Sequence, residues 1–200
     1  MKALLPATRF VDSINTGIGK RTAWLILLAV VVSSVNAVVR KAFDMSSNAW
    51  LELQWVLFSF VFLMCAPWTL LKNEHVRIDI VNHIMPKSVR NAIELIGHTL
   101  FLLPLCIILI ITGIPFFLLS ASINEQSYNT GGLPQWPTKS FIAIAFALLF
   151  LQGLSELVKR IAVVRGLIPD PHAAQKSSLE MEATEMIEAM GKPEDAPHEK

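Results

Sequence analysis

Four apolar runs, each long enough to cross a lipid bilayer, constrain the fold of this 200-residue chain more than any other feature. The clearest is 51–71, whose 21 residues would measure about 31 Å as a helix, the thickness of a hydrocarbon core. Hydrophobic residues make up 53% of the chain, so too few polar residues remain to cover a soluble protein. The sequence predicts an all-α integral membrane protein with four transmembrane helices. The predicted spans are 22–39, 51–71, 93–120 and 141–158.

The first and third runs have unusual lengths. The run 22–39 follows a basic lead, 1–21, and resembles a signal peptide, but its 18 apolar or small residues exceed the roughly 7–15 of a signal-peptide core, so an uncleaved span is favoured. The run 93–120 has 28 residues, which as a straight helix exceeds the bilayer core of about 30 Å. It contains Pro104 and Pro115, and each removes one helical hydrogen bond. We expect this span to tilt, kink or project.

The distribution of Lys and Arg predicts the orientation in the membrane. The lead, the loop after the second span and the segment after the fourth span carry four, four and three, whereas the other two loops carry two and one. The positive-inside rule therefore places both termini in the cytoplasm. Eight of the 16 acidic residues lie after Ile168, so 166–200 is predicted to be a short acidic cytoplasmic tail. A capping-box pattern at 177–180 is compatible with a short amphipathic helix there, or the tail is frayed.

Glu52 is the most informative ionisable residue, because it opens a membrane span where a charge is costly. It could couple transport to protons, or it could lie at the outer interface, paired with Arg40 or Lys41 or bonded to another helix. Its place at the end of the span, rather than at mid-depth, favours the structural role.

Further polar residues cluster near the predicted cytoplasmic side. His75, Arg77 and Asp79 alternate with apolar residues, which in an extended stretch places them on one face. No recognised ligand spacing supports a metal site there, so ion pairing with a neighbouring helix is favoured. Gln152 and Glu156, with Lys159 three residues on, predict a hydrogen-bonded patch at the inner end of the fourth span.

The sequence contains no nucleophile, base and oxyanion set, no glycine-rich phosphate loop and no metal triad. We therefore predict no enzyme activity, no catalytic residue, no cofactor and no metal site. Nucleic acid is not an expected partner, because there is no long basic run.

Three motifs resemble the small membrane subunit (DctQ-like, small permease) of tripartite ATP-independent periplasmic (TRAP) transporters over about 22–165. They are Trp50-Leu51-Glu52 at the start of the second span, the segment from His75 through Arg77 to Asp79 about twenty residues later, and Gly131-Gly132-Leu133-Pro134-Gln135-Trp136-Pro137 between the last two spans. One departure is Ala66-Pro67, where many members have a Gly-Ala pair.

The resemblance implies a multi-pass protein of the bacterial inner membrane that binds a large polytopic subunit. In that family the large subunit holds the substrate and sodium sites and moves as an elevator, and a periplasmic solute-binding protein delivers a carboxylated organic solute. The small subunit would steady the scaffold and help to dock the binding protein. The residues expected to be structural or partner-contacting are Trp50, Glu52, His75, Arg77, Asp79 and Trp136, together with the outer loops 40–48 and 122–138.

Two classes of function other than a TRAP small subunit are also considered for a four-span chain. A self-contained homodimeric four-span transporter would couple export to protons through Glu52, but no acidic residue lies at mid-depth. A membrane anchor for a respiratory complex would need paired haem ligands, whereas His98 is the only histidine within a span.

Overall fold

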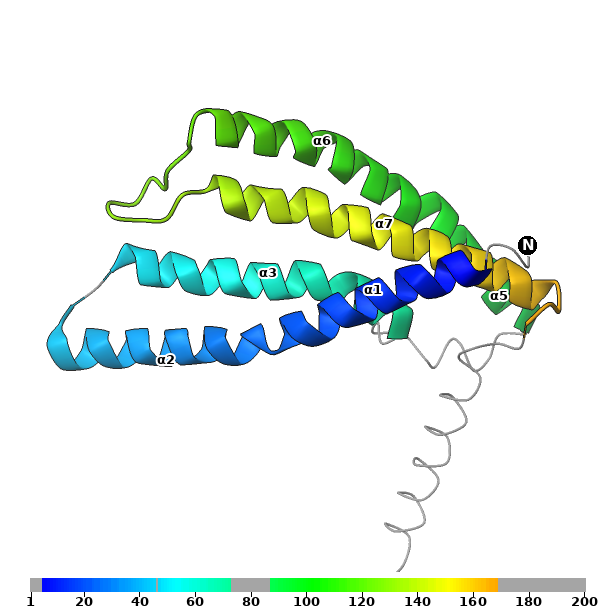
Figure 1. Cartoon of the computed structure of the whole chain (residues 1–200), viewed down its shortest axis with the longest axis horizontal. Coiled ribbons are helices and arrows are strands. Elements are labelled where there is room, and N and C mark those ends of the chain that lie inside the picture. Colours follow the sequence, from blue (N-terminus) through cyan, green and yellow to red (C-terminus); the bar gives the residue numbers. More distant parts are fainter. Residues whose placement is uncertain (1–4, 46, 73–86, 169–200) are drawn as a thin grey trace, which may run out of the picture. The chain divides into compact units, whose positions relative to one another are not determined.

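The computed structural model describes residues 5–45, 47–72 and 87–168, and every regular element in these ranges is a helix (Figure 1). Two compact units are present, Met1–Ile161 and Ala162–Lys200. The elements are α1 (Leu5–Ala23), α2 (Leu25–Phe43), α3 (Asn48–Lys72), α5 (Lys87–Ile96), the π-helical η2 (Gly97–Leu102), α6 (Leu103–Ser122) and α7 (Trp136–Val164).

Within the described residues, four helical stretches are long and apolar enough to cross a membrane, which confirms the predicted all-α architecture with four spans. They are Pro6–Phe43, Asn48–Lys72, Gly97–Ser122 and Trp136–Val164. Large apolar side chains point outward along all of them, for example Phe62 at 77% exposure. This is expected where lipid or another subunit, rather than the chain itself, covers a helix.

The amino-terminal lead forms a helix, α1, for which the sequence analysis made no prediction. This helix packs closely on the carboxyl-terminal part of α3. A Cβ atom placed on Gly19 would lie 2.6 Å from Cβ of Trp68, and the thiol of Cys65 lies 3.7 Å from the Gly19 carbonyl oxygen. Only glycine leaves room for this approach, so α1 is held on α3 by a backbone-to-side-chain contact.

Gly17→Ala and Gly19→Ala are expected to change stability in opposite directions. Alanine is better than glycine in a helix by up to about 1 kcal/mol, and a Cβ at Gly17 meets only the flexible end of Arg21 at 3.3 Å. At Gly19 the added methyl group must displace Trp68, at a cost of about 1–3 kcal/mol. Unfolding of the two purified variants in mild detergent measures both effects. Equal stability of the two variants would show that α1 does not pack tightly at Gly19.

The irregularity expected near Pro104 is present as the π-helical turn η2. The Leu103 N–H donates to the carbonyl oxygen of His98, five residues back, and Pro104 follows in the first turn of α6. The wider π turn accommodates a residue that lacks an N–H and whose ring crowds the preceding turn. Pro115 lies inside α6, which curves visibly in Figure 1. Pro67 likewise stands inside α3, which runs without a break through Ala66-Pro67.

Within the first unit, α7 packs on both α3 and α6. The Phe60 ring of α3 meets Phe141 edge to face, with centroids 4.7 Å apart, and a Cβ atom placed on Gly113 of α6 would lie 3.7 Å from Ala143. In the second unit α7 ends in a Schellman motif. The Leu167 N–H donates to Ala162 O and the Gly166 N–H to Val163 O, both at 2.9 Å, with Gly166 at φ +68°.

Candidate functional site

Glu52 lies in the second turn of α3 and is 6% exposed, and its carboxylate points into the loop 123–135 that joins α6 to α7. The Ser127 hydroxyl and the Asn129 amide, the latter at 2.9 Å, donate to Oε1, and the backbone N–H of Leu133 donates to Oε2 at 2.6 Å. The carboxylate thus accepts three hydrogen bonds from one loop. Charge-assisted bonds of this kind are stronger than neutral ones, so they hold the loop against α3.

The loop has its own hydrogen-bonded frame. Gln126 and Pro134 form an isolated antiparallel bridge, and the Ser127 N–H donates to the Leu133 carbonyl at 3.2 Å. The Asn48 side chain at the start of α3 donates to the Thr130 carbonyl oxygen at 3.0 Å. We call the group Glu52, Ser127, Asn129, Gly132 and Leu133 the Glu52 clamp.

Gly131 and Gly132 are needed for different reasons. Gly131 has φ +73° and open space around its Cα, so its requirement is conformational. A Cβ atom on Gly132 would lie 2.5 Å from Ser127 Cβ and 2.6 Å from Glu52 Oε1, so its requirement is steric. The glycine pair lets the loop close directly over the carboxylate.

An ion pair also stabilises the loop where it joins α6 and α7. The Lys139 ammonium pairs with Glu125 and lies 4.1 Å from the centroid of the Phe116 ring, a cation–π geometry. The hydrogen bond from Lys139 is the main cause that lowers the pKa of Glu125 below its ordinary value of 4.5. The contact links the end of α6, the loop and the start of α7.

The Glu125–Lys139 pair is expected to weaken in acid. Since the folded pKa of Glu125 is lowered, the pair's contribution to stability is complete above about pH 4.5 and is lost as the pH falls through the folded value. A carbon-detected NMR titration of the Glu125 carboxyl measures this pKa. Lys139→Gln should move it upward towards 4.5, and an unchanged titration in that variant would contradict the pairing.

A buried polar cluster joins α1 to α7 at the other end of the first unit. Gln152 is fully buried; it accepts a hydrogen bond from Asn15 Nδ2 at 2.7 Å and donates to Asp12 at 2.9 Å and to Glu156 at 3.0 Å. Lys159 bonds both carboxylates, with Nζ 3.1 Å from Asp12 Oδ2 and in contact with Glu156. Two acids therefore share one ammonium and one amide, which reduces the cost of burying them.

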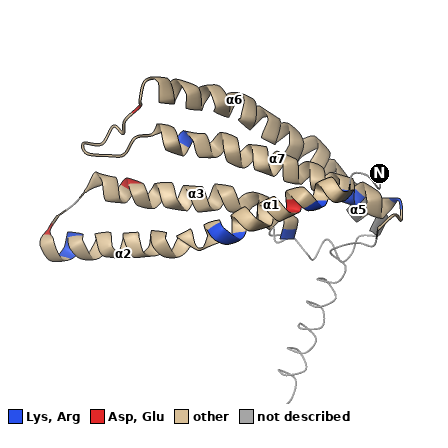
Figure 2. Cartoon of the chain, in the orientation of Figure 1, with Lys and Arg blue, Asp and Glu red and all other residues tan. Residues whose placement is uncertain are grey.

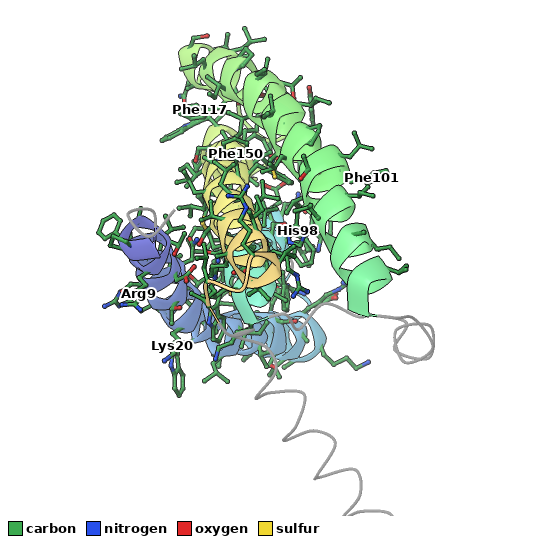
Figure 3. The ribbon with its side chains drawn as sticks, turned by 90° about the vertical axis from the view of Figure 1, so that its right-hand side faces the viewer. Arg9, Lys20, His98, Phe101, Phe117 and Phe150 are labelled. Carbon is green, nitrogen blue, oxygen red and sulfur yellow. The ribbon has the colours of Figure 1, made fainter. Side chains whose placement is uncertain are left out.

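The sequence predicted only half of this cluster. The patch of Gln152, Glu156 and Lys159 is present, but Asp12 and Asn15 were missed. Their signal was the helical spacing of the polar residues in the lead. Thr8, Asp12, Asn15 and Thr22 follow one another at intervals of four, three and seven, which is one face of a helix. Arg9, off that face of α1, points away from the bundle, as does Phe101 on η2 (Figure 3).

Among the residues that the structure describes, no group of three or more His, Cys, Asp or Glu side chains could hold a metal ion. Both polar sites bind other parts of the same chain. Their hydrogen bonds and ion pairs hold helices and loops of this chain together.

A family model, the DctQ component of tripartite ATP-independent periplasmic transporters, matches residues 28–163. The chain belongs to the DctQ family. This confirms the resemblance drawn from its motifs. No curated protein matches the chain. The DctQ family is a membrane component of transporters, not an enzyme family, and it functions with a large TRAP membrane subunit and a periplasmic binding protein.

The DctQ match contains the Glu52 clamp and the α7 half of the polar cluster, whereas α1, with Asp12 and Asn15, precedes it.

The Trp residues singled out by sequence, Trp50 and Trp136, stand at the starts of α3 and α7 and are partly exposed. The pairing of Glu52 with Arg40 or Lys41 was wrong: its hydrogen bonds come from the loop. His75, Arg77 and Asp79 lie outside the described residues, as does the capping-box segment 177–180.

Proposed function

We propose that this DctQ chain is the small scaffold subunit of a TRAP-type secondary transporter in a bacterial inner membrane. The transporter imports a carboxylated organic solute with a sodium gradient and a periplasmic binding protein. The observation that carries the proposal is the family match over residues 28–163, which covers α3, η2, α6 and nearly all of α2 and α7.

The buried carboxylates that the structure describes are all bonded to other groups of this chain, which supports a scaffold role rather than a pore. The Glu52 carboxylate is satisfied by its own loop, and Asp12 and Glu156 share Lys159. A coupling carboxylate would instead face a path for ions or protons within the membrane. The sodium and solute sites are accordingly assigned to the large subunit.

The proposed topology places both termini in the cytoplasm, with the Glu52 clamp on the periplasmic side. The last turn of α2, which contains Arg40 and Lys41, is joined by a short connection to the start of α3 and so lies at the same end of the first unit as the clamp; Figure 2 shows charged residues at this end of α2. In this arrangement the polar cluster between α1 and α7 stands at the cytoplasmic side, and the outer loops face the binding protein.

The scaffold role also explains the exposed helix faces. Large apolar side chains of α6, such as Ile108, Ile111 and Leu119, are more than half exposed in the isolated chain. They offer a surface that the large subunit and membrane lipids can cover.

Purification of the tagged chain from native membranes in mild detergent tests the proposal. The expected result is a large polytopic subunit in near one-to-one amount, identified by mass. An unrelated four-span protein with the same tag, purified in parallel, controls for carry-over. Recovery of the chain only as a stable homodimer would overturn the proposal and direct attention to Glu52 as a proton-coupling residue. That alternative has no support from the family match.

A further inference from the structure

Tyr128 is the only tyrosine of the chain, and its side chain is 99% exposed. Its two neighbours in sequence, Ser127 and Asn129, both hydrogen-bond to the buried carboxylate of Glu52. The backbone is thus fastened on each side of Tyr128 while the ring is left outside. No part of the described chain covers it.

A rigidly held, exposed aromatic residue is what protein interfaces use as an anchor. Tyrosine supplies a large contact area with only two side-chain torsions to order, so binding costs little conformational entropy. Here the Glu52 clamp has already ordered the backbone, which removes a further cost of association.

The surroundings of Tyr128 indicate a water-soluble partner rather than lipid. The exposed residues within four positions of Tyr128 are polar side chains and one glycine: Asn124, Gln126, Asn129, Thr130 and Gly131. Tyrosine in an interfacial belt would instead be accompanied by apolar neighbours that enter the bilayer. At the same end of the unit, Arg40 and Lys41 are exposed and form no ion pair with another described residue. These charges favour a partner surface with acidic residues around an apolar pocket.

We infer that the loop 123–135 is the part of this subunit that docks the soluble binding protein, with Tyr128 as the anchor and Glu52 as the residue that positions it. This inference rests on the proposed function and assigns its docking step to one side chain.

The experiment measures binding of the solute-loaded periplasmic binding protein of the same system to the complex of this chain with its large subunit in lipid nanodiscs. Tyr128→Ala should weaken binding about tenfold or more, whereas Tyr128→Phe, which keeps the ring, should weaken it much less. Trp24→Ala is the matched control, because Trp24 is 73% exposed at the far end of α2 and its loss should leave docking unchanged.

Binding of Tyr128→Ala within twofold of the unaltered complex would overturn the inference while leaving the scaffold role intact. Failure of the unaltered chain to hold a large subunit would overturn the proposed function and this inference together. A spin label at Tyr128→Cys adds a test of the environment. Contact with a water-soluble nickel chelate supports the docking surface, and contact with oxygen alone would place the residue in lipid and overturn it.

Discussion

Gln152→Leu is expected to lower the free energy of unfolding by about 3 kcal/mol. The side chain is fully buried and forms hydrogen bonds to Asn15, Asp12 and Glu156. Leucine fills a similar volume but cannot pair with any of them. The amide of Asn15 and two carboxylates would then lose a buried partner, which costs more than the original bonds contributed.

Unfolding of the purified protein in mild detergent, followed by circular dichroism, measures this loss. Gln126→Leu is the matched control, because Gln126 is exposed and its side chain bonds only to the nearby Asn124 carbonyl oxygen. A second readout is crosslinking between α1 and α7, which should fall in Gln152→Leu. Unchanged stability and crosslinking would show that the polar cluster does not hold α1 against α7.

Gly132→Ala is expected to open the Glu52 clamp, at a cost of about 1–3 kcal/mol. The added methyl group would overlap both the Ser127 side chain and the Glu52 carboxylate, each already within 2.6 Å of its position. The overlap with Ser127 distorts the loop itself, and the overlap with Glu52 pushes the loop away from α3. The hydrogen bond from the Leu133 N–H to Glu52 is then lost, so exchange of that amide with solvent should accelerate by roughly fivefold to 150-fold, as the cost implies.

Gly131 provides the internal comparison. Gly131→Asn should be well tolerated, because asparagine adopts positive φ more readily than other residues and nothing lies within 4 Å of the site. Gly131→Ala should cost about 1–2 kcal/mol. Hydrogen exchange at Leu133 separates the two glycines. If Gly131→Asn opened the loop as much as Gly132→Ala, the steric account of Gly132 would be contradicted.

The four spans could be predicted from the sequence because length and hydropathy alone determine whether a helix can cross a bilayer. The clamp could not, since it joins Glu52 to residues 75 to 81 positions away, and a single sequence does not show which donors will meet a buried carboxylate. The neighbouring cations Arg40 and Lys41 were the simpler expectation, but the loop supplies three donors without them.

α1 was missed for a different reason. The basic residues of the lead 1–21 are typical of the flank of a membrane span, whereas the signal for a helix lies in the spacing of its polar residues. The face formed by Thr8, Asp12 and Asn15 packs inward on α7, the reverse of the usual arrangement in a soluble amphipathic helix. The helical spacing of these polar residues is the sequence signal for α1.

The central claim, that the chain is a necessary scaffold but not the pore, is tested most directly by reconstituted transport. Proteoliposomes would contain the large subunit alone, this chain alone or both, with the solute-loaded binding protein outside and a panel of radiolabelled organic acids. We predict uptake only when both membrane subunits are present with an inward sodium gradient. Uptake by this chain alone, or equal uptake by the large subunit without it, would contradict the account.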